Sequence, residues 1–201
     1  MVLSCPTCNL RIEIDSFFEL VSAFNMNIIY ACGKNGEFGY ENKLPWNQPF
    51  KHDMKHFKER TRDQIVIMGY NTFHSLLTRR GLSDRTNIII DKAASLVQFD
   101  IDLNAYCVDT LSSALLLSLR LIGKKKIYLI GGKKLIEEAF SHPYCKQVYV
   151  TRIDESFEHD VKIDETNLFK SFEMYTKSDK IAENGISYHI CLYEKIADFV
   201  L

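Results

Sequence analysis

The hydrophobic positions of the chain follow two different spacings. Runs of consecutive β-branched and apolar residues are typical of buried strands, and they predict strands over residues 27–32, 65–68, 86–90, 126–130 and 148–153. Segments between these runs carry apolar residues at helical spacing, and they predict helices over 51–61, 71–77, 111–121 and 133–140. Strands that are hydrophobic on both faces are typical of a parallel sheet covered by helices. The predicted fold class is therefore α/β, with a mostly parallel central β-sheet, helices on both faces and strand and helix alternating throughout.

The C-terminal part of the chain predicts a different arrangement. Residues 172–195 contain two strand-like stretches separated by the polar segment 182–185, in which Asn184 and Gly185 tolerate a positive φ. We expect these stretches to form an antiparallel hairpin at the edge of the sheet. The length of 201 residues suits one domain with a single core.

The first 25 residues differ from the rest of the chain. Apolar residues at helical offsets predict a short amphipathic piece, with Phe17, Phe18, Leu20, Val21 and Phe24 on it. We expect residues 1–25 to be an extension, residues 26–197 to form the main domain and residues 198–201 to be a tail. Cys5 and Cys8 have the spacing of half a zinc knuckle or of a redox pair, but no second pair completes a zinc site. A plain extension is the favoured interpretation.

Composition and charge narrow the class of partner. The formal net charge of −1 and the pI near 6.6 provide no field for a polyanion, so we expect neither nucleic acid nor membrane as a partner. The most apolar stretch, 111–122, is shorter than the roughly 20 residues of a membrane span. Acidic residues interrupt any signal-peptide core near the N-terminus, which predicts a cytoplasmic protein. Six scattered cysteines are interpreted mainly as buried thiols.

Candidate chemistry first appears in a loop and the helix that follows it. The loop 39–47 holds the only tryptophan, Trp46, although a Pro-Trp turn is commonly structural. Asp53 and Phe57 are four residues apart and share a helix face. A carboxylate beside apolar side chains would be partly desolvated, and a ligand bearing donor nitrogens would suit it. A solvent-facing acid on an amphipathic helix is the competing interpretation.

Two further patterns allow both a structural and a functional interpretation. His52 and His56 have the spacing of a zinc-binding helix, but no third ligand follows at a telling distance, and we expect no metal site. Gly131 and Gly132 follow a predicted strand and precede a predicted helix. They form either a tight turn or a place where backbone amides meet a diphosphate.

The order of the motifs resembles that of the dihydrofolate reductases from Met26 to about Lys195. The matching segments are 28–31, 39–47, 53–58, 66–69 with 71–73, 85–90, 127–132 and 148–154. The resemblance implies a dihydrofolate reductase-like fold and an enzyme that reduces 7,8-dihydrofolate to 5,6,7,8-tetrahydrofolate by hydride transfer from NADPH, in support of one-carbon metabolism and thymidylate synthesis. It also implies a monomer whose partner is a small-molecule folate. We expect a monofunctional enzyme, because the chain ends soon after the predicted hairpin.

The resemblance assigns roles on the substrate side. Asp53 would anchor the pterin ring, Trp46 would hold an ordered water beside that carboxylate, and Leu44 would belong to a mobile lid, so these three form the predicted catalytic set. Arg85 would bind the α-carboxylate of the glutamate tail, although a surface arginine is the competing interpretation. The predicted substrate-binding residues are Ile29, Tyr30, Asp53, Phe57, Leu76, Leu82, Arg85, Ile130 and Thr151.

The resemblance also assigns cofactor contacts, with four departures from the family pattern. Tyr70 stands where a basic residue usually binds the 2′-phosphate, and Asp91 where a small hydroxyl residue is usual. NADPH remains the expected cofactor, with weakened discrimination against NADH, because a carboxylate repels phosphate and accepts from a ribose hydroxyl. Lys133 replaces a small residue and Ile136 an aromatic one. The predicted cofactor residues are Ala31, Phe38, Gly39, Asn42, Lys43, Gly69, Tyr70, Asn71, Thr72, Asp91, Lys92, Gly131, Gly132, Lys133, Lys134 and Leu135.

Two alternatives to this enzyme stay open from the sequence. A riboflavin-pathway pyrimidine reductase shares the fold, but it lacks the arrangement of residues 44–46 followed by Asp53 and Phe57. A non-catalytic scaffold or binding protein on the same fold is the other alternative, because a fold does not determine function.

Overall fold

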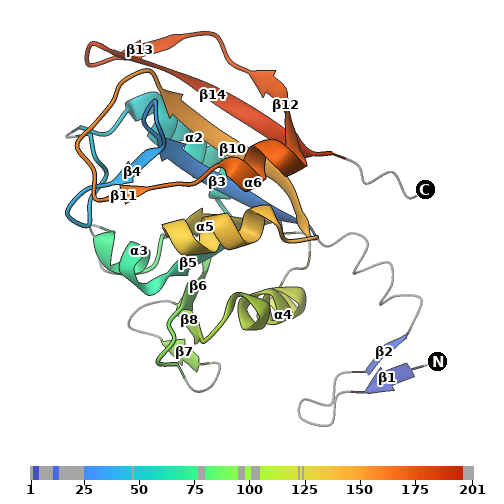
Figure 1. Cartoon of the computed structure of the whole chain (residues 1–201). Coiled ribbons are helices and arrows are strands. Elements are labelled where there is room, and N and C mark those ends of the chain that lie inside the picture. Colours follow the sequence, from blue (N-terminus) through green and yellow to red (C-terminus); the bar gives the residue numbers. More distant parts are fainter. Residues whose placement is uncertain are drawn as a thin grey trace.

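The main body of the molecule is a twisted sheet between layers of helices (Figure 1). The computed structural model describes residues 25–46, 48–76, 80–94, 98–100, 105–121, 123 and 125–196, together with two short strands before them. In the described residues the strand order is β12-β14-β10-β3-β9-β5-β6-β8-β7, with β13 paired to β14. In chain order these strands are β3 (Met26–Cys32), β5 (Ile65–Gly69), β6 (Thr86–Ile90), β7 (Gln98–Asp100), β8 (Ala105–Val108), β9 (Ile127–Gly131), β10 (Cys145–Ile153), β12 (Phe172–Lys177), β13 (Ile181–Glu183) and β14 (Ile186–Lys195).

The direction of the strands confirms the predicted fold class. The central pairs β10–β3, β3–β9, β9–β5, β5–β6 and β6–β8 are parallel. At one edge β14 pairs antiparallel with β10, β12 and β13, and at the other edge β7 pairs antiparallel with β8. The turn between β13 and β14 has φ of 55° at Asn184 and 79° at Gly185, as the sequence predicts.

The helices cover both faces of the sheet. In the part of the chain that the structure describes they are α2 (Lys51–Thr61), α3 (Tyr70–Ser75), α4 (Leu111–Leu121), α5 (Lys133–Phe140) and α6 (Thr166–Ser171). Residues of α4, α5 and α6 share one apolar cluster with the side chains of Ile28, Ile67 and Leu129. On the opposite face, residues of α2 and α3 share a second cluster with Ile29 and Met68. Adjacent strand residues such as Ile28 and Ile29 point to opposite faces, so each strand contributes to both layers.

Strict alternation of strand and helix was wrong between β6 and α4. Both β7 and β8 lie there, and α6 was not predicted either. These elements are three to six residues long, which is too short for a hydrophobic period to be recognised. The first strand of the C-terminal hairpin is divided into β12 and β13. For the helix predicted over 71–77, the structure shows α3 at Tyr70–Ser75, and residue 77 lies outside the described residues.

The N-terminal segment contains two short strands. β1 (Val2–Ser4) and β2 (Arg11–Glu13) pair antiparallel with each other. The predicted amphipathic piece at residues 17–24 and the pair Cys5 and Cys8 lie outside the described residues. No helix in the described part of the chain combines the length and apolar character that crossing a bilayer requires.

A second pair of short strands connects two distant loops. β4 (Glu37–Gly39) follows β3, and it pairs antiparallel with β11 (Val161–Lys162), which follows β10. After β4 the chain makes a turn in which the amide of Tyr40 donates to the carbonyl of Lys43 and the amide of Lys43 donates to the carbonyl of Tyr40. Glu41 and Asn42 have φ of 49° and 61° in this turn. The loop 39–46 is therefore fixed to the segment that follows β10.

Candidate active site

The candidate site is centred on a carboxylate near the start of α2. Asp53 lies in the first turn of this helix, and its Oδ1 accepts a hydrogen bond of 2.5 Å from the hydroxyl of Thr151 on β10. Burial raises the pKa of Asp53 above its ordinary value, while the bond from Thr151 acts in the opposite direction. The competing interpretation, an acid turned outward to solvent, is therefore wrong for Asp53. Its carboxylate is held in a partly dry environment.

An apolar cluster lies on the same face of the sheet as this carboxylate. Ile29 on β3 is 5% exposed, and six partly buried side chains pack on the same cluster. Four of the six were predicted from the family resemblance to contact substrate: Phe57, Leu76, Leu82 and Ile130. The structure thus brings residues from α2, the segments around α3, β3 and β9 together on one wall.

Tyr30 is the exception among the predicted substrate residues. Its side chain packs in the cluster on the opposite face of the sheet, where its hydroxyl donates to Glu165. The reason is strand alternation, because Tyr30 lies between Ile29 and Ala31 and must point away from both. The Tyr30 side chain therefore points away from the site, and a contact between its backbone and substrate stays a prediction.

The predicted tryptophan is a buried wall of the site. Trp46 is 5% exposed, and its ring lies 6.0 Å from the ring of Phe50 and 5.7 Å from that of Phe157. Phe50 in turn lies 5.0 Å from the ring of Tyr188 on β14. Ala31 packs against the same cluster, so Trp46 borders the carboxyl end of β3.

Arg85 lies beside Phe57 at the edge of the apolar wall. Its guanidinium carbon is 5.7 Å from the centre of the Phe57 ring. Nε donates to the hydroxyl of Thr61 at 2.9 Å, and Nη1 donates to the carbonyl of Ser83 at 2.6 Å. These two bonds fix the direction of a half-buried guanidinium. Within the described residues it forms no ion pair, so Nη2 can meet an anion.

The glycines predicted to meet a diphosphate converge from three elements. Gly131 and Gly132 connect β9 to α5 through a cis peptide bond, and Gly131 has φ of 142°. A Cβ on either glycine would lie 3.1 Å from the hydroxyl oxygen of Thr72 on α3. A Cβ on Gly69, at the end of β5, would lie 3.7 Å from the backbone nitrogen of Gly132. A side chain on Gly131 or Gly132 would press on Thr72, whereas a Cβ on Gly69 would make an ordinary contact. The first amide groups of α5 have no partner within the helix, and such groups favour an anion.

The fold and this arrangement agree with the comparisons with known proteins. A sequence model of the family described as "Dihydrofolate reductase" matches residues 25–195. The chain belongs to the dihydrofolate reductase family. A dihydrofolate reductase type 9 from Escherichia coli is 33% identical over 163 residues, covering 80% of this chain and 87% of that protein. The dihydrofolate reductase of Bacillus subtilis (strain 168) is 32% identical over 174 residues, covering 85% and 94%.

Two further comparisons define how far the similarity extends. A bifunctional dihydrofolate reductase-thymidylate synthase from Paramecium tetraurelia is 33% identical over 162 residues, and the chain spans 33% of its length. A solved dihydrofolate reductase from Enterococcus faecalis, complexed with NADP(H) and RAB-propyl, superposes with a TM-score of 0.73 at 23% identity, covering 86% of this chain and 97% of that one. The predicted family and α/β fold class are therefore confirmed.

Two residues that depart from the family pattern, Tyr70 and Asp91, lie where the adenosine end of the cofactor is predicted to bind. Tyr70 is 47% exposed, and its ring lies 4.2 Å from that of His74. Asp91 follows β6, directly after Ile90, which is in register with Gly69 of β5. Its Oδ1 accepts from the amide of Ala93 at 3.0 Å. The carboxylate is thus fixed near the carboxyl ends of two adjacent strands.

The remaining predicted cofactor residues lie in two places. The first group borders the loop after β4, where the Phe38 ring reaches within 3.8 Å of a Cβ built on Gly131. Leu44 of that loop is 49% exposed. The second group lies at the starts of α3 and α5. Lys133 forms an ion pair with Glu137 at 3.8 Å, and a Cβ on Gly69 would lie 3.4 Å from the side chain of Leu135. The predicted residues of these groups are Gly39, Asn42 and Lys43 in the first, and Asn71, Lys92 and Lys134 near the second.

Asp160 was missed by the sequence reasoning. Its amide donates to the carbonyl of Gly39 at 3.0 Å, and its Oδ2 accepts from the amide of Glu41 at 3.0 Å. These bonds hold the loop that carries Leu44 and Trp46. No motif marks Asp160, because it lies in an acidic stretch without hydrophobic pattern.

A second missed contact holds the start of α2. Glu183 on β13 accepts from the amide of His52 at 3.1 Å and from the hydroxyl of Tyr188. The first turn of α2 is thus fixed by the C-terminal hairpin.

The second histidine of the possible zinc-binding pair lies farther along the helix. The ring of His56 is 6.1 Å from that of Tyr149, and burial lowers the pKa of His56 to about 4. No group of three or more metal ligands gathers in the described residues.

Proposed function

We propose that this chain is an NADPH-dependent dihydrofolate reductase that converts 7,8-dihydrofolate to 5,6,7,8-tetrahydrofolate. The observation that supports this most is the half-buried Asp53, held by Thr151 beside an apolar wall that contains Phe57 and Ile29. A pterin ring offers neighbouring amino and ring N–H donors to a carboxylate and a flat apolar surface to that wall. The proposal therefore assigns the pterin to this face of the sheet.

Asp53 binds and orients the ring in this mechanism. Thr151 occupies Oδ1, which leaves Oδ2 to accept from the pterin. The raised pKa of Asp53 reflects the cost of burying its charge, and donors on a bound ring compensate that cost. Assistance to protonation of the ring nitrogen next to the reacting carbon is worth about 10²–10⁴ in rate. Trp46, in its buried aromatic cluster, would hold the water that relays this proton and keep bulk solvent out.

The residues around Gly131 and Gly132 fit the diphosphate of a dinucleotide. A Cβ at either position would press on Thr72, and the amide groups at the start of α5 favour a negative charge. When bound, NADPH supplies the hydride. The protein holds the donor and acceptor carbons at roughly 3–3.5 Å, with Ala31 beside the nicotinamide and Leu44 on the covering loop.

The proposal retains NADPH as the main cofactor and NADH as a weaker alternative. Lys92 is a cation near the adenosine end, but the neighbouring Asp91 carboxylate disfavours a 2′-phosphate. Tyr70 supplies a ring instead of a positive charge. Discrimination between the two cofactors should therefore be reduced.

The proposal includes the organisation and setting of the protein. Residues 26–197 form the catalytic domain, with an extension at 1–25 and a tail at 198–201. The protein acts as a cytoplasmic monomer on a small-molecule folate, without nucleic acid or membrane as a partner. The nearly neutral net charge of −1 supports the absence of a polyanionic partner.

An absorbance assay of cofactor oxidation tests the proposed activity. We expect dihydrofolate-dependent turnover with NADPH and slower turnover with NADH. Asp53→Asn should reduce kcat/KM by about 10²–10⁴, while the matched change Asp179→Asn, at an exposed position between β12 and β13, should have no effect. Absence of turnover by the folded wild-type protein would refute the proposal.

A further inference from the structure

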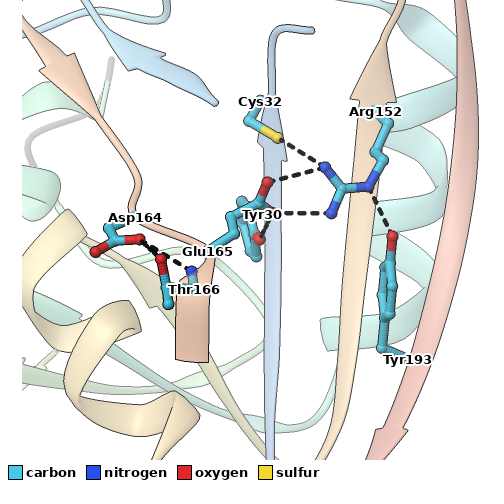
Figure 2. A network of polar contacts seen from close by, with 7 residues as sticks. All are labelled: Tyr30, Cys32, Arg152, Asp164, Glu165, Thr166 and Tyr193. Carbon is cyan, nitrogen blue, oxygen red and sulfur yellow. Dashed lines mark hydrogen bonds and ion pairs between the residues drawn. The ribbon is translucent and has the colours of Figure 1, made fainter. Parts of the chain in front are cut away.

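A partly buried polar network lies behind the two strands that frame the site (Figure 2). Arg152 on β10 donates from Nη1 to Oε2 of Glu165 at 3.0 Å and from Nη2 to Oε1 at 2.9 Å. Its Nε donates to the hydroxyl of Tyr193 on β14 at 2.8 Å. Tyr30 on β3 donates its hydroxyl to the same Glu165, and Cys32 lies 4.0 Å from Nη1. One ion pair thus connects three strands to the start of α6.

The geometry of this network is strongly constrained. The Arg152 side chain is 24% exposed and that of Glu165 is 11% exposed, so each charge depends on the other for compensation. Burial alone would lower the pKa of Arg152, but Glu165 outweighs it and raises that pKa. Burial and Glu165 raise the pKa of Tyr30 well above its ordinary value. Arg152 therefore stays charged and Tyr30 stays a donor throughout the working pH range.

The network alternates along the strands with residues that face the site. Tyr30 lies between Ile29 and Ala31, and Arg152 directly follows Thr151. In the parallel register Thr151 is opposite Ala31, and Arg152 is opposite Cys32. Thr151 and Arg152 are consecutive on β10 and point to opposite faces of the sheet, so a shift of the backbone at Arg152 would displace the Thr151 hydroxyl as well.

Glu165 also anchors the segment that holds the loop over the site. It immediately precedes α6, and Phe169 donates its amide to the Glu165 carbonyl. Asp164 accepts from the amide and the hydroxyl of Thr166 at 2.9 and 2.6 Å, which fixes the first turn of α6 (Figure 2). A few residues earlier the same segment forms β11 and contains Asp160. The segment that pairs with β4 therefore continues directly into the residue that binds Arg152.

We propose that Arg152, Glu165 and Tyr30 are positioning residues that set the Thr151–Asp53 hydrogen bond from the far side of the sheet. None of the three side chains reaches the substrate face. The kinetic part of this inference depends on the proposed reductase activity. A role in positioning explains why an ion pair lies behind the site. Displacing a catalytic group by about 1 Å can lower the rate about 10²-fold, so a network that holds Thr151 in place would preserve activity.

Two variants separate positioning from folding stability. Glu165→Gln leaves the half-buried charge of Arg152 without its carboxylate partner and should lower Tm. Arg152→Met with Glu165→Gln leaves no unpaired charge, and the Gln oxygen still accepts from Tyr30, so this double variant keeps most of the stability. Lys55→Met with Glu59→Gln is the matched control, because it removes an exposed ion pair of α2.

The decisive readout is the titration of the Asp53 carboxyl, followed by NMR on protein without ligands. The groups that act on it are Thr151 from β10, Glu183 from β13, Tyr188 from β14 and His52 on α2. The bond from Thr151 lowers the pKa of Asp53, so misplacing Thr151 should raise it. Thr151→Val provides the reference for complete loss of the bond.

We expect the double variant to raise the pKa of Asp53 in the same direction as Thr151→Val and to lower kcat about tenfold, with the matched control unchanged. A double variant that folds and keeps the wild-type Asp53 titration would overturn the inference. If the wild-type protein lacks turnover, the proposed function fails, but the Asp53 titration still decides whether the network positions Thr151. If Glu165→Gln does not fold, the double variant carries the test.

Discussion

Thr151 donates its hydroxyl hydrogen to Asp53 at 2.5 Å, although the two residues lie 98 positions apart in the sequence. Thr151→Val keeps the shape of the side chain and removes this bond. We expect the pKa of Asp53 to rise, because the bond stabilises the charged form, and kcat to fall about tenfold. NMR titration and steady-state kinetics measure the two effects. Thr176→Val on the exposed strand β12 is the control, and an unchanged Asp53 titration in Thr151→Val would contradict this account.

The charged carboxylate of Asp53 should lower the free energy of unfolding at neutral pH. Burial raises its folded-state pKa above the ordinary value of 3.8, so the folded protein holds this proton more tightly than the unfolded chain. The stabilising contribution is complete below the unfolded pKa and is lost as the pH rises through the folded pKa. Asp53→Asn should therefore raise Tm at neutral pH, by about 2–4 °C for each kcal/mol.

Thermal unfolding at about pH 7 and about pH 3 checks this prediction. The difference between Asp53→Asn and wild type should vanish at the lower pH, where both side chains are neutral. The exposed substitution Asp63→Asn is the control. A lower Tm for Asp53→Asn at neutral pH would show that the charged carboxylate stabilises the fold.

Arg85 should act on substrate affinity. Thr61 and Ser83 hold its guanidinium beside Phe57, which leaves the group oriented for a carboxylate. Arg85→Lys loses the planar bidentate geometry, so we expect KM for dihydrofolate to rise far more than kcat falls. Steady-state kinetics with dihydrofolate measure both. An unchanged KM would show that Arg85 does not bind the glutamate tail.

Asp91 should weaken the preference for NADPH. Its carboxylate is fixed by the amide of Ala93 at the end of β6, where it would repel a 2′-phosphate. Asp91→Ser should raise the ratio of kcat/KM for NADPH to that for NADH about tenfold, since placing like charges together is unfavourable. The ratio should not change in Asp100→Ser, a matched control on β7. If Asp91→Ser and wild type have the same ratio of kcat/KM for NADPH to kcat/KM for NADH, Asp91 does not contribute to cofactor discrimination.

Asp160 should control the loop that covers the site. Asp160→Ala removes the acceptor for the Glu41 amide, which is a charge-assisted hydrogen bond at the surface. We expect kcat/KM to fall about tenfold, because the closed loop becomes less populated. Asp160→Asn keeps an accepting oxygen and should recover part of the activity, whereas Glu158→Ala should have no effect. Equal activity of Asp160→Ala and wild type would mean that the hydrogen bond between Asp160 and the Glu41 amide is not needed for activity.

The central strands could be predicted because they carry long apolar runs. Ile65–Gly69 and Thr86–Ile90 are buried on both faces, and burial on both faces leaves a continuous hydrophobic segment in the sequence. β4 and β11 carry no such signal, because each is two or three residues long and is formed by pairing between distant segments.

The candidate site was predictable only where family motifs mark it. Asp53 and Arg85 lie in recognisable segments, whereas Asp160 and Glu165 act through contacts with residues more than a hundred positions away. The direction of the Tyr30 side chain could also be derived from the sequence. Strand alternation assigns it to the face opposite Ile29 and Ala31, and it packs there.

The transfer of a labelled hydrogen tests the central claim most directly. The wild-type protein and Asp53→Asn would each be mixed with dihydrofolate and NADPH that carries deuterium on its reacting carbon, and the products would be analysed by mass spectrometry. We predict deuterated tetrahydrofolate from the wild-type protein and about 10²–10⁴ times slower formation by Asp53→Asn. Cofactor oxidation without deuterium in the folate product, or equal rates for the two proteins, would contradict a hydride transfer that depends on Asp53.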